Sequence, residues 1–176
     1  EGYKRVYPEG PHFSSVLGYT GLVGAKDLVR DPSLGTQAVV GRSGIEAFYD
    51  HELRGKPGAI LQMRDARGEP LGSLDRVLPK IGSPLRLTID GEFQSYFYER
   101  FRKGLAALGR TTGVGLAMNP QTGEVLALIN FPTFDNNLFS VSGKNKERQE
   151  LLVSPQKPLF NRAVSGLYPA GSTIKP

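Results

Sequence analysis

Glycine and proline recur so often in this chain that a bundle of long helices is excluded. Among the 176 residues are 22 glycines and 13 prolines, in clusters such as residues 7–11 (Tyr-Pro-Glu-Gly-Pro). Proline removes a backbone donor and clashes with the preceding helical turn, and glycine favours turns. Because 39% of the residues are hydrophobic, the short elements between these breaks can still bury a core. We therefore expect an α+β fold with an irregular, β-rich first part.

The pattern of apolar residues predicts the regular elements. Ser43 is placed to cap a helix, with Glu46 three residues further on as a capping box requires. The Pro-Gln-Thr-Gly turn at 120–123 joins two apolar strands. In all, we predict strands over residues 16–22, 59–65, 69–77, 85–90, 113–119 and 124–131, helices over 43–54 and 92–108, and a flexible surface loop over 30–41.

The predicted helix over 92–108 carries the most regular apolar stripe. Its members are three or four residues apart, which places them on one helix face: Phe93, Phe97, Phe101, Leu105 and Leu108. An aromatic stripe can hold a ligand, but at helical spacing it is far more often core, and we assign it to the core. Strand, helix and hairpin together predict a helix packed on an antiparallel sheet.

Charge and composition narrow the classes of function. Lys and Arg number 22 against 17 Asp and Glu, a net charge of +5, which admits an anionic partner such as nucleic acid. The basic residues are scattered, so we interpret them as solvated surface charge. There is no cysteine, and the two histidines are His12 and His51. Thiol nucleophiles are therefore excluded, no transition-metal site or cofactor is expected, and we place both histidines at the surface.

Membrane and export signals are not expected either. No apolar run approaches the ~18 residues of a membrane-spanning helix. The opening residues 1–5 (Glu-Gly-Tyr-Lys-Arg) are polar, unlike a secretory leader.

The segment 172–175 (Ser-Thr-Ile-Lys) has a spacing suited to nucleophilic catalysis. On a helix, Ser172 and Lys175 would share one face, so the amine could take the proton of the hydroxyl once its pKa is lowered from ~10.4. Backbone N–H groups at the start of such a helix can stabilise an oxyanion. Taken alone the spacing is weak evidence, because it more often describes a serine that only caps a helix. It also occurs a second time, at 154–157 (Ser-Pro-Gln-Lys).

Several segments resemble class B penicillin-binding proteins, in the order of that family and over nearly the whole chain. Residues 168–176 (Tyr-Pro-Ala-Gly-Ser-Thr-Ile-Lys-Pro) are similar to the family's active-site segment. Residues 5–21, with Arg-Val-Tyr-Pro and Leu-Gly-Tyr-Thr-Gly, and residues 41–58 resemble its non-catalytic N-terminal module. Residues 87–94 and 115–135 resemble the start of its transpeptidase domain. The wording around Tyr-Pro-Glu-Gly-Pro-His resembles the elongation-type members most.

The resemblance implies an activity and the residues that carry it. Members of the family are D,D-transpeptidases, which cross-link peptidoglycan stem peptides ending in D-Ala-D-Ala through a serine acyl-enzyme, outside the bacterial cytoplasmic membrane. β-Lactams acylate the same serine. By position, Ser172 is the implied nucleophile and Lys175 the implied base. The resemblance also implies that residues 1–83 contact elongation partners, namely a scaffold protein and a membrane glycosyltransferase.

The chain also departs from the family pattern. It contains neither Ser-x-Asn nor Lys-Thr/Ser-Gly, which the family carries downstream of Ser-x-x-Lys. We also expect the family's upstream membrane anchor to lie outside residues 1–176. We therefore expect a middle fragment, with residues 1–83 as part of the pedestal module and residues 84–176 as the first part of the transpeptidase domain. Two prolines and a glycine within 79–84 mark the boundary. We expect the fragment alone to be inactive, because groups that complete the acylation site are missing.

Other functions remain open. A serine β-lactamase or β-lactam sensor also uses Ser-x-x-Lys but lacks the N-terminal segments, and the deacylation rate separates it from a transpeptidase. An interaction module built on residues 1–83 would bind elongation partners without being labelled by penicillin. Nucleic-acid binding rests only on the net charge of +5 and predicts an affinity that falls steeply with salt.

Overall fold

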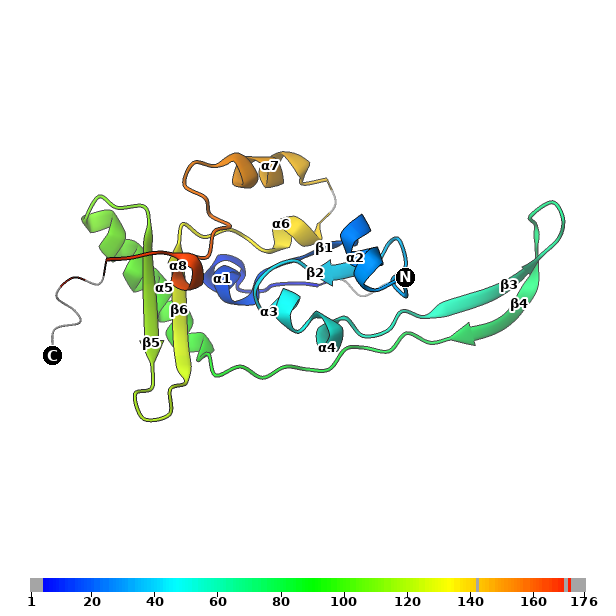
Figure 1. Ribbon diagram of the computed structural model, residues 1–176, viewed down its shortest axis with the longest axis horizontal. Coiled ribbons are helices and arrows are strands. Elements are labelled where there is room, and N and C mark those ends of the chain that lie inside the picture. Colours follow the sequence, from blue (N-terminus) through cyan, green and yellow to red (C-terminus); the bar gives the residue numbers. More distant parts are fainter. Residues whose placement is uncertain (1–4, 142, 170, 172–176) are drawn as a thin grey trace.

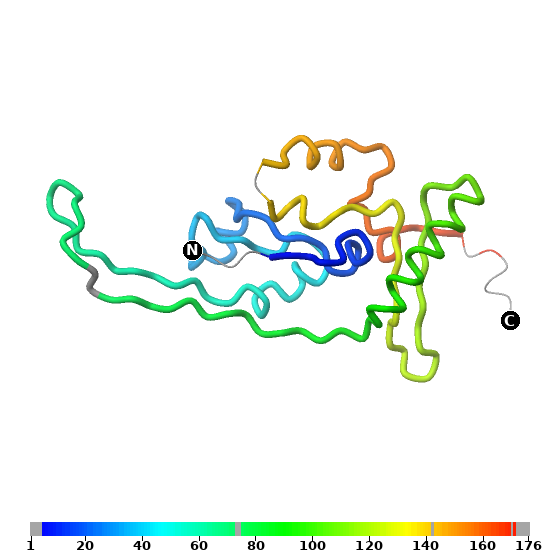
Figure 2. The backbone as a smooth tube through the Cα atoms, turned by 180° about the vertical axis from the view of Figure 1, so that it is seen from behind, coloured from blue at the N-terminus to red at the C-terminus, as the bar shows by residue number. Residues whose placement is uncertain are grey.

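The computed structural model describes residues 5–141, 143–169 and 171 (Figure 1). The molecule is elongated, with a helix-and-hairpin unit at one end, a group of short elements in the middle and a two-stranded arm at the other end (Figures 1 and 2). This mixture of helices and strands confirms the predicted α+β class. Along the chain the elements are η1 (Gly10–His12), α1 (Ser14–Leu17), β1 (Thr20–Leu22), α2 (Ala25–Arg30), β2 (Val39–Gly41), α3 (Gly44–Phe48), α4 (Asp50–Arg54), β3 (Ala59–Arg64), β4 (Pro70–Val77), α5 (Gly91–Ala107), β5 (Gly113–Met118), β6 (Val125–Phe131), α6 (Asn137–Ser140), α7 (Asn145–Val153) and α8 (Arg162–Ser165).

The strands of the described residues form separate antiparallel pairs. β1 pairs with β2, β3 with β4, and β5 with β6. The predicted hairpins over 59–77 and 113–131 are confirmed, and each turn contains a glycine with positive φ, Gly68 or Gly123. The β3–β4 hairpin is the arm in Figure 1, and every residue of β3 is exposed.

The core lies where α5 packs on β6. Tyr98 of α5 is buried against Ile129 and Phe131 of β6, and Phe97, Phe101 and Leu105 pack around them. Two glycines on β5 allow this close approach: a Cβ on Gly113 would lie 3.0 Å from the Leu105 side chain, and one on Gly115 would lie 2.8 Å from the Phe97 ring. The predicted helix on an antiparallel hairpin is therefore confirmed.

The predicted apolar stripe on α5 is wrong at its two ends. Leu108 is 74% exposed and Phe93 is 37% exposed. The buried face instead includes Gln94, which is fully buried. Its amide donates to the Leu128 carbonyl at 2.9 Å and accepts from the Leu128 N–H at 2.8 Å. Residues four apart drift gradually around a helix of 3.6 residues per turn, so a stripe with this spacing cannot face the sheet along its whole length.

The predictions for the first part of the chain need correction. Of the strand expected over 16–22, only β1 forms, because the preceding residues belong to α1, which ends at Leu17 and is followed by Gly18 with a φ of 74°. The loop expected over 30–41 ends in β2, which pairs with β1. Three-residue strands between glycines carry too little alternation to be recognised from sequence.

Two further elements differ from the sequence predictions. The helix expected over 43–54 is divided into α3 and α4, which meet at Tyr49, although Gly55 ends it as expected with a φ of 71°. Ser43 sits at the N-cap position without a side-chain capping bond. The strand expected over 85–90 is irregular, because its last residue, Asp90, caps α5 by accepting the Phe93 N–H at 2.9 Å.

Glycines hold the short elements of the middle together. A Cβ on Gly18 would overlap the Ser43 carbonyl oxygen, and one on Gly44 would lie 2.6 Å from the Val16 carbonyl oxygen. The end of α1 and the start of α3 are thus in backbone contact. Two segments that the sequence marks as motifs, 16–21 and 41–46, meet at this point.

Replacement of Gly18 tests this contact. We expect Gly18→Ala to lower the free energy of unfolding by about 2–4 kcal/mol, because it adds left-handed backbone strain to an overlap with Ser43. Urea unfolding of the chain, followed by circular dichroism, measures the change. Gly35→Ala is the matched control, since a Cβ there has no neighbour within 4 Å. Equal unfolding curves for the two variants would contradict the prediction.

Candidate functional site

The predicted catalytic residues, Ser172 and Lys175, lie outside the described residues, so their arrangement stays a prediction. The second Ser-x-x-Lys match is described, and it is a turn. The Lys157 N–H donates to the Ser154 carbonyl at 2.9 Å, and Lys157 has a φ of 48°. These two residues are therefore not one turn apart on a helix, and their spacing carries no catalytic meaning.

The segment that leads to Ser172 is well anchored. We call residues 160–169 the approach segment, and it contains α8, which packs against β5 and β6. Asn130 of β6 is 2% exposed and holds this segment with both ends of its amide. Its Nδ2 donates to the Phe160 carbonyl at 3.2 Å, and its Oδ1 accepts from the Arg162 N–H at 2.9 Å. A buried amide satisfied on both sides fixes the backbone in one position.

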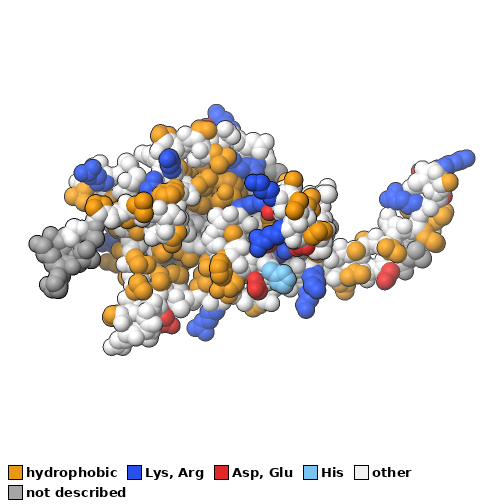
Figure 3. Space-filling model, viewed as in Figure 1, with side chains coloured by type: hydrophobic (Ala, Val, Ile, Leu, Met, Phe, Trp, Pro, Cys, Tyr) orange, Lys and Arg blue, Asp and Glu red, His pale blue; other side chains and the backbone are white. Residues whose placement is uncertain are grey.

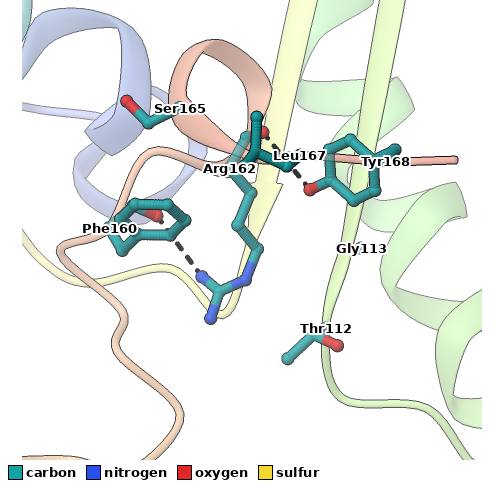
Figure 4. A pocket seen from close by; sticks show the side chains of 8 residues that line it. Thr112, Gly113, Phe160, Arg162, Ser165, Leu167 and Tyr168 are labelled. Atoms are coloured by element: carbon teal, nitrogen blue, oxygen red, sulfur yellow. Dashed lines mark hydrogen bonds between the residues drawn. The ribbon is translucent and has the colours of Figure 1, made fainter.

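Arg162 organises the approach segment from within (Figure 4). Its guanidinium donates to the carbonyls of Lys157 at 3.1 Å and Phe160 at 3.3 Å, and also to that of Gln156. The same group lies 5.7 Å from the centre of the Phe160 ring, a cation–π contact. The Tyr168 hydroxyl donates to the Arg162 carbonyl at 3.2 Å. The guanidinium of Arg162 thus stabilises the backbone conformation of the approach segment through these contacts.

An open pocket of about 490 Å³ lies between the approach segment and the start of β5. Figure 4 shows how its side chains lie around this space. The lining residues are Thr112, Gly113, Phe160, Arg162, Ser165, Gly166, Leu167 and Tyr168. Among the described residues, the lining combines apolar side chains with hydroxyl groups and one guanidinium, and it contains no carboxylate or imidazole. This lining therefore supplies no general base, and the nucleophile and base of the sequence prediction would have to come from the residues that follow.

A buried carboxylate lies at the middle of the molecule, at a position where the sequence pattern predicts only a helix cap. Glu46 of α3 is 6% exposed. Its Oε1 lies 2.8 Å from Arg5 Nε and accepts from the Tyr7 hydroxyl at 3.2 Å. Burial and, to a smaller extent, the Glu46 carboxylate raise the pKa of Tyr7 above its ordinary value. Arg5, Tyr7 and Glu46 all fall within the motif segments, but they are far apart in sequence, and spacing gives no sign that they meet.

The residues after β6 bind the N-terminal part of the chain. Asn137 accepts from the Tyr7 N–H at 3.0 Å and donates to the Tyr7 carbonyl at 2.8 Å. The Tyr19 ring stacks on Phe139 at 3.8 Å and meets Phe134 edge-on at 6.0 Å. Burial raises the pKa of Tyr19. Segments about 120 residues apart in the sequence are thus joined by both hydrogen bonds and aromatic contacts.

The surface prediction is wrong for His12. Its ring centre lies 4.2 Å from that of Tyr98, its Nδ1 lies 3.3 Å from Ser95 Oγ, and its side chain is 26% exposed. His12 therefore packs η1 onto α5. His51 is exposed on α4, as expected.

Within residues 5–141, 143–169 and 171, no cluster of three or more His, Asp or Glu side chains is arranged to hold a metal ion. In the same part of the chain, no helix has the length and apolar character needed to cross a bilayer.

Two segments of the chain match models of known protein families. Residues 1–87 match the penicillin-binding protein dimerisation domain, and residues 113–176 match the penicillin-binding protein transpeptidase domain. The chain therefore belongs to the penicillin-binding proteins, and the resemblance inferred from its motifs is confirmed.

Individual relatives narrow this class. The peptidoglycan D,D-transpeptidase MrdA of Acinetobacter baumannii is 37% identical over 98% of this chain, and that of Escherichia coli K12 is 36% identical over 100%. This chain spans 25% and 28% of the length of these two relatives.

Two solved structures are similar over almost the whole chain. Penicillin-binding protein 2 of Helicobacter pylori, in complex with MreC, has a TM-score of 0.76 and 32% identity, covering 98% of this chain and 31% of that one. Penicillin-binding protein 2 of Pseudomonas aeruginosa, in complex with WCK 5153, has a TM-score of 0.72 and 35% identity, covering 97% and 33%. The chain thus resembles the penicillin-binding protein 2 branch.

Loss of the buried carboxylate tests the Arg5–Tyr7–Glu46 contact. We expect Glu46→Gln to lower the free energy of unfolding by about 1–3 kcal/mol. The substitution removes the negative charge that Arg5 and Tyr7 contact and replaces one carboxylate oxygen with an NH2 group, which cannot accept a hydrogen bond. Urea unfolding of the chain measures the change. Glu150→Gln, at an exposed position of α7, is the control and should leave stability within ~0.5 kcal/mol of the wild type. Identical stability of both variants would show that Glu46 is not held as described.

Proposed function

We propose that the protein containing this chain is an elongation-type peptidoglycan D,D-transpeptidase, with Ser172 as its nucleophile and Lys175 as its base. One observation carries the proposal: the Tyr-Pro-Ala-Gly-Ser-Thr-Ile-Lys-Pro sequence at 168–176 lies inside the match to a transpeptidase domain. Support also comes from relatives that are named D,D-transpeptidases and align with 98–100% of the chain.

The proposed chemistry is acyl transfer through serine. The Ser172 oxygen attacks the carbonyl carbon of the penultimate D-Ala of a stem peptide, and the Lys175 amine takes the hydroxyl proton. The bond to the terminal D-Ala breaks, that D-Ala leaves with the proton on its amine, and an acyl-serine remains. An amine of a neighbouring stem peptide then attacks the ester, forms the cross-link and returns a proton to Ser172. A β-lactam acylates the same oxygen, but its leaving group stays tethered, so the ester persists.

We propose that residues 1–176 alone are inactive. The chain spans only 25–28% of the named relatives and lacks Ser-x-Asn and Lys-Thr/Ser-Gly. Later residues of the full-length protein would then complete the active site. We propose that the full-length protein acts outside the cytoplasmic membrane and that an N-terminal segment anchors it there. No metal or cofactor enters this mechanism.

We propose residues 1–83 as the pedestal module and residues 84–176 as the first part of the transpeptidase domain. Two contacts support a boundary after Ser83. The Ser83 N–H donates to the Glu52 carbonyl at 2.8 Å. The backbones of Lys56 and Lys80 pair in an isolated antiparallel β-bridge. These contacts support counting the chain up to Ser83 with the first module, and the cap of α5 by Asp90 supports counting the later residues with the second.

Removal of the nucleophile tests the activity. In the full-length protein, we expect Ser172→Ala to abolish covalent labelling by a fluorescent penicillin, because the attacking oxygen is gone, while Ser154→Ala labels like the wild type. Gel fluorescence after a time course measures the labelled fraction. The wild-type adduct should hydrolyse far more slowly than the acyl-enzyme of a β-lactamase does. This slow deacylation distinguishes a transpeptidase from a hydrolytic relative. Labelling of Ser172→Ala at the wild-type rate would overturn the proposal.

We also propose that the pedestal module binds a scaffold protein of the elongation machinery and a membrane glycosyltransferase. Support for the scaffold comes from the similar Helicobacter pylori protein, whose structure is a complex with MreC. The arm offers a surface for such a partner, because apolar side chains line it while basic ones gather at its tip (Figure 3). Ile60 and Leu61 are each 59% exposed, and Leu71 is 65% exposed. Two-stranded hairpins with exposed apolar faces gain stability when a partner covers them.

Substitution on the arm tests this surface. We expect Leu61→Ser with Leu71→Ser to weaken binding of a purified MreC-type protein to the full-length protein by at least about tenfold, since buried apolar contacts are lost. Isothermal calorimetry measures the affinity. Val29→Ser on α2, at a residue 84% exposed but away from the arm, is the control and should bind unchanged. Unchanged binding of the double variant would remove the arm from the interface.

A further inference from the structure

The ring of His12 lies between η1 and α5, and a carboxylate faces each of its two nitrogens. Its Nδ1 lies 3.8 Å from Glu9 Oε2, and its Nε2 lies 3.9 Å from Glu99 Oε1. Glu9 directly precedes η1, whereas Glu99 belongs to α5. The two carboxylates thus reach one imidazole from elements that are far apart in the sequence.

Two further side chains of α5 contact the ring. Ser95 Oγ lies 3.3 Å from His12 Nδ1, and a hydroxyl can donate to a neutral ring nitrogen or accept from a protonated one. The Tyr98 ring centre lies 4.2 Å from that of His12, where an aromatic face favours a cation. The Tyr98 hydroxyl is engaged elsewhere, with Thr133 Oγ1 at 3.1 Å. These contacts therefore accommodate the imidazolium as well as the neutral ring.

The backbone of His12 is held in place by a bond that does not depend on the charge of the ring. Gln94 Nε2 donates to the His12 carbonyl at 2.7 Å. Gln94 is fully buried and is itself fixed by its two bonds to Leu128. The ring of His12 therefore stays close to both carboxylates when its protonation changes.

The cations of α5 leave one oxygen of Glu99 to His12. Arg102 donates to Glu99 Oε2 at 2.8 Å and 3.2 Å, whereas His12 faces Oε1. The hydrogen bonds from Arg102 and, to a smaller extent, the charges of Arg102, His12 and Lys103 lower the pKa of Glu99. Between about pH 5 and 8, where histidine side chains change their charge, Glu99 is therefore ionised throughout.

We propose that His12 is a pH-sensitive contact between η1 and α5: its imidazolium pairs with Glu9 and Glu99 and holds the two elements together, and deprotonation releases both pairs. Because the folded state supplies partners for the protonated ring, the stabilisation is present at low pH and is lost as the pH rises through the range in which histidine titrates. The side chain is 26% exposed, so water and salt screen the two pairs in part. The inference does not depend on the acylation chemistry proposed above.

Hydrogen exchange at two pH values tests the proposal. In the full-length protein, exchange of the peptide that covers residues 10–17 is followed by mass spectrometry at about pH 5.5 and pH 8. Each rate is divided by the intrinsic rate at that pH, which gives an opening constant. Hydrogen bonds such as that from the Leu17 N–H to the Phe13 carbonyl, at 2.9 Å, protect this peptide. We expect the opening constant of the wild type to be about three- to tenfold larger at the higher pH, because both ion pairs are lost.

Two variants remove this rise by different routes. His12→Gln removes the titrating ring, whereas Glu9→Gln combined with Glu99→Gln removes both carboxylates and keeps the ring. We expect the opening constant of either variant to differ by less than about twofold between the two pH values. Glu9 makes no side-chain capping bond to η1, so its replacement leaves that element intact. Glu92→Gln, at an exposed position of α5, is the matched control and should respond to pH as the wild type does.

Each outcome supports the contact or overturns it. Equal opening constants of the wild type at the two pH values, or a larger constant at the lower pH, show that the proposal is wrong. A rise that both variants keep also overturns it, because the pH then acts at other groups. Loss of the rise in Glu92→Gln would assign it to the overall charge of α5 and would contradict the two pairs. Circular dichroism is recorded for every variant, and if one does not fold, the other decides.

Discussion

The pair of hydrogen bonds between the Asn137 side chain and the backbone of Tyr7 joins the first residues of the chain to the segment after β6, 130 residues away in the sequence. One amide accepts the Tyr7 N–H and donates to the Tyr7 carbonyl, as a neighbouring strand would. Asn136 adds a bond to the Gly18 carbonyl beside it. These asparagines lie in the region that matches the transpeptidase domain, whereas Tyr7 and Gly18 lie in the region that matches the dimerisation domain. The two matched regions are therefore held together by side-chain contacts and are not joined only through the intervening residues 88–112.

Polar contacts of this kind give the structure its specificity because its apolar core is small. The buried cluster consists of Tyr98, Ile129 and Phe131. Gln94 and Asn130 are buried to a similar degree, and each bonds to backbone groups through both ends of its amide. A buried amide without its partner costs about 1–3 kcal/mol, so such contacts permit few alternative arrangements. A site that depends on the placement of one hydroxyl gains from this restriction.

The local sequence pattern was sufficient to predict the elements with strong periodicity. It was insufficient to predict contacts between residues far apart in the sequence. The helix over α5 and the hairpins on either side of it follow from apolar spacing and from turn residues, and they are confirmed. The short strand β2 and the division at Tyr49 give no periodic signal. Contacts such as Asn161 with Ser15 join residues 146 apart, and an asparagine has the same appearance in the sequence whether it clamps a distant carbonyl or lies in solvent. For the catalytic pair, motif resemblance alone points to Ser172 and Lys175, and they stay predictions.

The central claim is that a single serine oxygen, at the end of a braced segment, receives the acyl group. Peptide mapping by mass spectrometry of the full-length protein, after reaction with benzylpenicillin, tests this claim most directly. The account predicts one penicilloyl group per molecule, on the peptide that contains Ser172 and at that residue. An adduct located on any other residue, with the peptide around Ser172 unmodified, would contradict it.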